Sequence, residues 1–152
     1  MTLSEFDTRA PKGTDKDETK KLTKKIAKEI QSYQSKMHAE KKHSLLVVFQ
    51  GMDSSGKDGA TRETFKYCSP SGIITKAFGK PTNEEFAHDF LWRVHKHVPA
   101  KGMIQIFNRS HYEDILVPSV EGYFSKKVIN ERYDLINQFE KTIEHNGTKI
   151  LK

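Results

Sequence analysis

A glycine-rich segment at residues 51–59 carries the strongest chemical signal in the sequence. From Gly51 to Lys57 it has the spacing G-x-x-x-x-G-K, and it lies between a short apolar run and a stretch of helical character. This spacing is typical of a phosphate-binding loop. Glycines let successive backbone N–H groups turn toward phosphate oxygens, and the lysine reaches the outer phosphates. The residues expected to contact phosphate are Gly51, Ser54, Ser55, Gly56, Lys57, Asp58 and Gly59.

Two carboxylates, Asp53 and Asp58, lie inside this loop. The position after the lysine is ordinarily Ser or Thr, whose hydroxyl binds Mg²⁺, but here it is Asp58. A carboxylate beside bound phosphate repels it unless a cation lies between them, so at least one of the two should hold Mg²⁺. We predict Asp53 as the metal ligand because it lies in the middle of the loop. Asp58 could instead interact with the positive end of the following helix.

A second polar cluster, residues 108–114, follows an expected strand. Ligands of open α/β sheets bind outside the carboxyl ends of the strands, so this cluster should lie beside the glycine-rich loop. Arg109 is suited to clamp phosphoryl oxygens. Glu113 and Asp114 are candidates for a second catalytic carboxylate. The alternatives are a structural ion pair for Arg109 and a place in the first turn of a helix for the two acids.

The remaining reactive residue types carry weaker signals. His111 lies within the second cluster and is an open candidate for ligand contact, whereas Cys68 and Trp92 are expected in the core. A single cysteine excludes a disulfide scaffold.

The elements that must position these residues alternate between strand and helix, which predicts an α/β fold with a parallel sheet flanked by helices. Strands are expected at residues 45–49, 73–78, 103–107 and 148–152, and helices at 18–38, 60–68, 82–98 and 125–145. The first helix should be amphipathic, because apolar residues recur every three or four positions. These are Leu22, Ile26, Ile30, Tyr33 and Met37. We expect a loose arm at residues 1–17, a first unit over residues 1–40, and a core that carries the phosphate-binding loop over residues 41–152.

Composition excludes several classes of protein. The 152 residues include 26 Lys and Arg against 20 Asp and Glu, which gives a formal net charge of +6. Lysine supplies most of the positive charge, so we expect a polyanion as partner and not a nucleic acid, whose readers favour arginine. The longest apolar run has five residues, far below the roughly 20 of a membrane span, and no secretory leader is visible. We expect a cytoplasmic protein without membrane contact.

Five segments in order resemble the polyphosphate kinase 2 family. They are APKG at residues 10–13, HSLLVV at 43–48, the loop at 51–59, AHDFLWR at 87–93 and FNRSHYED at 107–114. The resemblance implies a P-loop kinase-like fold and Mg²⁺-dependent transfer of a terminal phosphoryl group between inorganic polyphosphate and an adenine nucleotide. It also implies catalytic roles for Asp53, Lys57 and Arg109.

The chain departs from many members of that family at Asn108, where they carry Asp. This departure resembles the branch that phosphorylates AMP as well as ADP, and it shifts metal or catalytic duty toward Glu113 or Asp114. The choice between these two acids stays open.

The resemblance further implies a longer chain with a helical lid rich in arginine and lysine. Because residues 148–152 read as the opening of a strand, we expect the sequence to be truncated at its C-terminus, with sheet and lid incomplete and activity reduced. Two other functions remain open: an ATP-dependent nucleoside or nucleotide kinase, and a non-catalytic phosphate-binding module. The N-terminal helix offers a surface through which copies could associate as a homo-oligomer.

Overall fold

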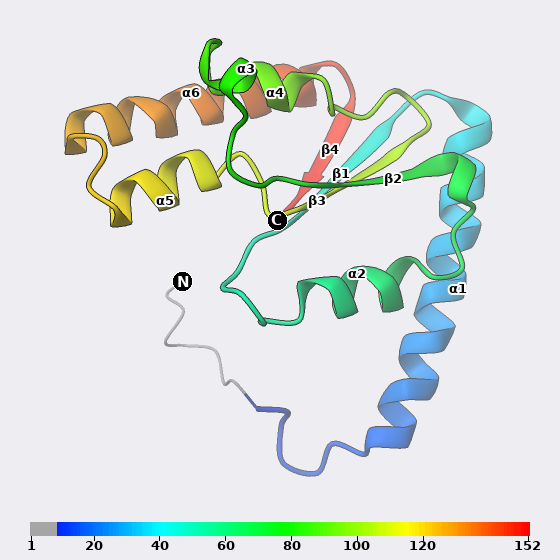
Figure 1. The fold of residues 1–152 in the computed structure, drawn as a ribbon. Helices are drawn as coiled ribbons and strands as arrows, with labels where there is room; N and C mark the ends of the chain where they lie inside the picture. Colours follow the sequence, from blue (N-terminus) through cyan, green and yellow to red (C-terminus); the bar gives the residue numbers. More distant parts are fainter. Residues whose placement is uncertain (1–8) are drawn as a thin grey trace.

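A four-stranded parallel sheet forms the centre of the fold (Figure 1). The computed structural model describes residues 9–152, so the predicted arm at 1–17 lies partly outside the described residues. The strands are β1 (Ser44–Phe49), β2 (Ile73–Ala77), β3 (Ile104–Asn108) and β4 (Thr148–Leu151), in the spatial order β2-β3-β1-β4. All three strand pairs are parallel, which confirms the predicted α/β class.

Strand β1 is buried on both faces of the sheet. Leu46 and Val48 pack into a core on one face, whereas Val47 packs with Ile104 and Ile106 of β3 on the other. Alternate residues of a strand point to opposite faces, so a continuous apolar run suits a strand that is covered on both sides. The apolar run at residues 45–49 therefore forms the inner strand that it predicted.

The helices form two layers around this sheet (Figure 1). Helices α1 (Lys16–Glu40) and α2 (Lys57–Phe65) lie on one side, and Met37 and Phe65 pack against the smaller core cluster. On the other side lie α3 (Asn83–Phe86), α4 (Trp92–His95), α5 (Glu113–Val120) and α6 (Lys126–His145). A short 3-10 turn, η2 (Pro70–Gly72), precedes β2, where a turn was predicted. Within residues 9–152, no helix has the length and apolar character that crossing a bilayer requires.

Helix α6 follows the prediction closely. The Ser125 hydroxyl oxygen accepts a hydrogen bond from the Val128 N–H and caps the first turn. At the other end the chain turns at Gly147, whose φ of 92° favours glycine. The buried face of the helix carries Ile129, Ile136, Phe139 and Ile143.

The single helix expected over residues 82–98 is wrong. The predicted capping box of Thr82 and Glu85 is present, but helix α3 ends at Phe86 and a second short helix begins only at Trp92. Between them the Asp89 carboxylate accepts a hydrogen bond of 3.0 Å from the Leu91 N–H. Such a local bond offers the backbone an alternative to the helical ladder, and it interrupts the helix here.

Helix α1 is longer than predicted, and only part of its predicted apolar face is covered. The Asp15 carboxylate accepts hydrogen bonds from the N–H groups of Asp17 and Glu18, so the helix begins within the predicted arm. Its buried residues are Ala27 and Gln34, whereas three residues of the predicted apolar face stay exposed. These are Leu22, Ile26 and Tyr33, with exposed fractions of 57%, 45% and 69%. In Figure 1 the N-terminal end of α1 continues past the sheet, which explains why the core does not cover Leu22 and Ile26.

Helix α5 was predicted only indirectly. The first turn of a helix was one alternative that the sequence offered for the two acids of the second cluster. Glu113 and Asp114 form its first turn, as that alternative expects. The helix contributes Ile115 to the core and ends by residue 120, shortly before α6 begins.

Replacing Ile136 by alanine should lower the free energy of unfolding by about 2–5 kcal/mol, because a buried side chain is removed and a cavity remains. Ile136 is fully buried, whereas its neighbour Leu135 is 46% exposed. Leu135→Ala is therefore the control, with an expected loss of under about 1 kcal/mol. Urea denaturation of both variants measures the difference, and equal losses would contradict the assignment of the buried face of α6.

A buried carboxylate in α6 should make stability depend on acid pH. Burial by itself would raise the pKa of Glu140, but hydrogen bonds from His111, Lys152 and Tyr112 outweigh burial and lower the pKa from 4.5 to about 2. A depressed carboxyl pKa stabilises the fold above its unfolded value of 4.5, and this contribution is lost as the pH falls from 4.5 toward 2. The contribution at neutral pH is about 3 kcal/mol.

We therefore expect Glu140→Gln to lower the free energy of unfolding at pH 7 and to have a shrinking effect at lower pH. Urea denaturation of wild type and variant between pH 2.5 and pH 7 tests this. A difference that stays constant with pH would show that ionisation of Glu140 does not stabilise the fold.

Candidate active site

The register of the sheet brings the two predicted clusters together. Phe49, the last residue of β1, pairs with Asn108, the last residue of β3. The Arg109 N–H then donates a hydrogen bond of 3.0 Å to the Phe49 carbonyl. The glycine-rich loop leaves β1 at the same edge at which the second cluster leaves β3, as the sequence predicted.

The loop connects β1 to α2 and contains two left-handed residues. Gly56 caps α2 with φ 91°, and Ser54 has φ 63°. Glycine adopts this conformation freely, whereas Ser54 is held in it against its preference. The curled loop leaves N–H groups at the start of a nine-residue helix, where the positive end of the helix favours an anion.

Lys57 reaches back across the loop. Its ammonium group donates hydrogen bonds of 2.8 Å to the Gly51 carbonyl and 2.7 Å to the Met52 carbonyl, with the Ser55 hydroxyl at 3.4 Å. The positive charge is therefore fixed at the mouth of the loop, where the outer phosphates of a ligand would lie.

Both loop carboxylates contact the second cluster. Asp53 forms an ion pair with Arg109, and Asp58 accepts a hydrogen bond from the Asn108 side-chain amide. Asp58 also lies in the first turn of α2, as the alternative for this residue expected. The carboxylates that were predicted beside phosphate thus lie at the edge of the sheet, within reach of the segment that follows β3.

The donor set at this edge fits Mg²⁺. Among residues 9–152, no three His, Cys, Asp or Glu side chains are grouped as a protein cage for a metal ion would require. Mg²⁺ does not need such a cage, because it usually keeps several waters and binds one or two carboxylates together with substrate phosphates. Asp53 and Asp58 supply carboxylate oxygens of this kind at the loop.

Arg109 lies between two cavities. One, of about 610 Å³, is lined by the loop and by Asn108 and Arg109. The other, of about 520 Å³, lies beside it and shares the wall residues Phe78, Gly79 and Arg109. The backbone of Arg109 is left-handed, with φ 60°, so the chain holds this residue in a strained conformation at the shared wall.

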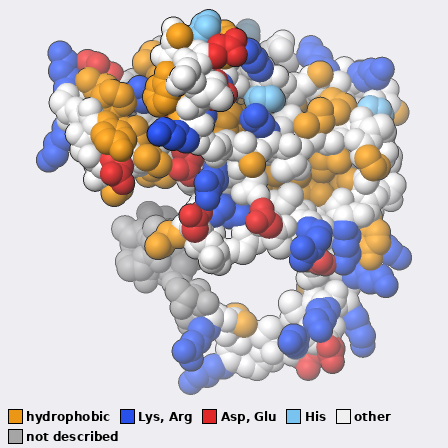
Figure 2. All heavy atoms as spheres, in the orientation of Figure 1, with side chains coloured by type: hydrophobic (Ala, Val, Ile, Leu, Met, Phe, Trp, Pro, Cys, Tyr) orange, Lys and Arg blue, Asp and Glu red, His pale blue; other side chains and the backbone are white. Residues whose placement is uncertain are grey.

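The second cavity has an aromatic and basic lining. Phe86, Phe90, Tyr123 and Phe124 contribute apolar surface, and three arginines contribute positive charge: Arg93, Arg109 and Arg132. Figure 2 shows hydrophobic side chains gathered on the neighbouring surface over α5, including Leu116, Val117 and Val120. A pocket of this lining suits a ligand with a flat ring and an anionic group.

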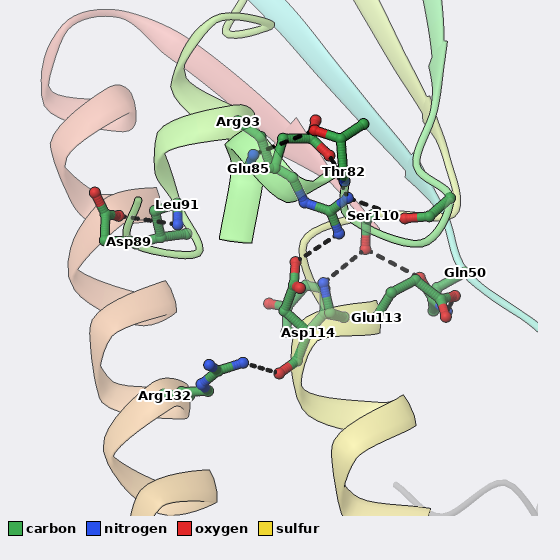
Figure 3. Close-up of polar contacts among 12 residues, drawn as sticks. Gln50, Thr82, Glu85, Asp89, Leu91, Arg93, Ser110, Glu113, Asp114 and Arg132 are labelled. Atoms are coloured by element: carbon green, nitrogen blue, oxygen red, sulfur yellow. Dashed lines mark hydrogen bonds and ion pairs between the residues drawn. The ribbon is translucent and has the colours of Figure 1, made fainter. Parts of the chain in front are cut away.

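Arg93 ties the wall of this cavity together (Figure 3). It is 5% exposed and donates hydrogen bonds of 2.9 Å to the Gly79 carbonyl and to the Asp114 carboxylate, with Glu85 at 3.6 Å. Burial raises the pKa of Asp114, and the hydrogen bond and charge of Arg93 act in the opposite direction. Asp114 is therefore engaged in a structural pair, as one of the expectations for these acids allowed.

Arg132 extends the same network from α6. Its guanidinium donates a hydrogen bond of 2.5 Å to the Asp114 carbonyl and lies 4.6 Å from the centre of the Phe90 ring and 4.3 Å from that of Phe124. The sequence prediction missed Arg93 and Arg132. A lone arginine among apolar residues, as in FLWR at residues 90–93, was the signal for the first.

Glu113 differs from its neighbour. It is half-buried, lines the second cavity beside Arg109, and accepts a hydrogen bond of 2.7 Å from the Gln50 side-chain amide. Gln50 was also missed, although it directly precedes the loop. Of the two acids, Glu113 is the one whose carboxylate lies at the cavity without a cationic partner among the described ion pairs.

His111, the open candidate for ligand contact, lines neither cavity, and neither do Cys68 and Trp92, which were expected in the core. His111 is fully buried, and its Nε2 lies 3.2 Å from the Glu140 carboxylate. Cys68 is buried, as predicted, and burial raises the pKa of its thiol. Trp92 is half-buried and stacks on His88, with the ring centres 4.0 Å apart.

Known proteins match this chain over most of its length. The sequence matches the polyphosphate kinase 2 (PPK2) family over residues 13–152. An AMP/ADP-polyphosphate phosphotransferase of Meiothermus ruber is 46% identical over 127 residues, which are 84% of this chain and 48% of that protein. An ADP-polyphosphate phosphotransferase of Rhodopseudomonas palustris is 33% identical over 150 residues, covering 90% of this chain and 52% of the relative.

A solved structure shares the fold. The crystal structure of polyphosphate kinase 2 from Arthrobacter aurescens superposes with a TM-score of 0.93 at 36% identity, covering all of this chain and 56% of the other. The chain thus spans about half the length of the curated relatives it matches. The family match over residues 13–152, together with the loop and cluster at the edge of the sheet, shows that this chain belongs to the polyphosphate kinase 2 family.

Proposed function

We propose that this chain forms the catalytic core of an enzyme that transfers a phosphoryl group between inorganic polyphosphate and a nucleoside mono- or diphosphate. The observation that carries the proposal is the pair of adjoining cavities, one lined by the phosphate loop and one by aromatic and basic residues, with Arg109 at their shared wall. Phosphoryl transfer needs two anionic ligands held end to end with positive charge at the junction, and this arrangement supports that geometry.

The loop side is suited to the phosphate chain. Lys57 holds an ammonium group at the mouth of the loop, and the backbone from residue 51 to residue 59 curls around the same point. Such fixed charges stabilise the negative charge that spreads over the transferred group. The lysine-rich surplus of the whole chain adds attraction for a long polyanion.

The aromatic cavity is suited to an adenine nucleotide. Phe90 and Phe124 offer ring surfaces on which a purine can stack, and Arg132 lies against both rings. Arg109 reaches from this cavity to the loop, so it can contact the phosphate of the acceptor and the transferred group together. We propose AMP and ADP as acceptors, because relatives of this chain carry those names.

Asp53 and Asp58 are the residues that would hold Mg²⁺. The bound ion supplies charge neutralisation between the phosphates. Asp53 is the first ligand in this proposal, since it lies in the loop and its ion pair with Arg109 places both groups at the same point. Asp58 stays close through its contact with Asn108.

Glu113 is the second functional carboxylate in this proposal, and Asp114 is a structural one. Glu113 lines the cavity beside Arg109, whereas Asp114 is bound to the buried Arg93. Association of copies through α1 stays a prediction, and the exposed Leu22, Ile26 and Tyr33 are the surface it would use.

Replacing Lys57 by alanine should lower the rate of transfer by at least about 100-fold, because the fixed positive charge at the outer phosphates is lost. The assay mixes the protein with Mg²⁺, polyphosphate and ADP and measures ATP by luciferase. Lys101→Ala is the control, since this exposed lysine precedes β3 at the opposite edge of the sheet. Transfer that survives Lys57→Ala, or ATP formed without polyphosphate, would contradict the proposed reaction.

Substitutions of the neighbouring acids Glu113 and Asp114 should have different effects, one on the transfer rate and the other on stability. Glu113→Gln should lower transfer about 10- to 100-fold and leave the free energy of unfolding within about 0.5 kcal/mol of wild type. Asp114→Asn should lower the free energy of unfolding by about 1–3 kcal/mol, because the buried Arg93 loses the nearer of its two anionic partners and keeps only Glu85 at 3.6 Å. Urea denaturation and the transfer assay together measure both effects. A loss of stability in Glu113→Gln together with a loss of transfer alone in Asp114→Asn would contradict this assignment of the two acids.

A further inference from the structure

Gln50 joins the two halves of the site. It lies between the end of β1 and Gly51, the first glycine of the loop. Its side-chain amide donates a hydrogen bond of 2.7 Å to the Glu113 carboxylate, and its side-chain oxygen accepts one of 3.0 Å from the Ser110 hydroxyl (Figure 3). One side chain on the loop side therefore contacts two residues of the cluster that follows β3.

A third hydrogen bond continues from Ser110. The Tyr112 backbone N–H donates to the Ser110 hydroxyl oxygen at 3.2 Å. The Ser110 hydroxyl thus accepts from the backbone and donates to the Gln50 side-chain oxygen, while the NH₂ group of Gln50 donates to Glu113.

The Glu113 carboxylate is the acceptor at the other end of this chain of hydrogen bonds. One of its oxygens contacts Gln50, and the carboxylate lies at the wall of the aromatic cavity beside Arg109. We call the hydrogen-bonded series Ser110, Gln50 and Glu113 the relay. Ser110 is fully buried, so this end of the relay is held in the core.

We propose that Gln50 is a positioning residue for the transfer reaction. Through the relay from Ser110, its amide holds the Glu113 carboxylate at a set distance from the phosphate loop that Gln50 itself begins. The inference rests on the proposed function and adds a residue to it. Because reacting groups must be placed to within a fraction of an ångström, a link between the loop and the acceptor-side carboxylate bears on the rate.

A double-mutant cycle tests this link. Gln50→Ala should lower kcat about 10-fold or more, with little change in KM for polyphosphate, because the loop itself is intact. The double variant Gln50→Ala with Glu113→Ala should be no slower than Glu113→Ala alone, since both changes remove the same contact. Gln138→Ala is the matched control, a glutamine on the exposed face of α6, and should have wild-type kinetics.

The pH dependence of a Gln50→Glu variant gives a second kinetic test. Gln50→Glu keeps the shape of the side chain but places a second carboxylate against Glu113, so kcat should fall at least as far as in Gln50→Ala and recover as the pH is lowered. Independent effects that multiply in the double variant, or a Gln50→Glu variant with wild-type kcat at neutral pH, would overturn the positioning role.

A measurement that needs no turnover separates this inference from the proposed function. In NMR spectra of the ¹⁵N-labelled chain, the Gln50 side-chain NH₂ should exchange slowly with water in the wild type and quickly in Ser110→Ala and Glu113→Ala. Rapid exchange in the wild type, or no response to either variant, would overturn the relay. Slow exchange that both variants abolish, in a wild type without transfer activity, would support the relay and contradict the proposed reaction.

Discussion

The pairing of β1 with β3 is the constraint on which the rest of the site depends. Because Phe49 lies opposite Asn108 in a parallel register, two segments almost sixty positions apart in the sequence leave the sheet at one edge. The hydrogen bond from Arg109 to Phe49 continues this pairing beyond the strands. A shift of one residue would turn the side chains of β3 to the opposite faces and separate Arg109 from the loop.

Charge is distributed around this edge according to burial. The exposed pairs, Asp53 with Arg109 and Asp58 with Asn108, lie at the loop, where ligand and solvent can exchange with them. The buried pair of Arg93 and Asp114 forms part of the wall of the aromatic cavity, where losing either partner would remove a short ion pair that is shielded from solvent. Neighbouring acids in the sequence therefore have different surroundings, because the first turn of α5 places Glu113 beside Gln50 and Asp114 against the buried Arg93.

Much of this arrangement could be predicted from local patterns. The apolar run at residues 45–49, the spacing of the loop and the capping residue Ser125 each depend on neighbours a few positions away, and the structure confirms all three. The helix over residues 82–98 was wrong because one local hydrogen bond, from Leu91 to Asp89, outweighs a favourable apolar period. The apolar stripe of α1 was correct as a pattern, but periodicity does not say whether another layer lies opposite.

The sequence by itself determined the class of the fold, the phosphate loop and the segment that carries Arg109, because each is written in short-range spacing and composition. Only the tertiary structure decided the contacts within that segment. It placed Asp114 against Arg93, Glu113 beside Gln50, and His111 in the core against Glu140. These contacts join residues 21 to 63 positions apart, and their partners are selected by strand register and by which face of each helix is buried. No local pattern encodes that choice.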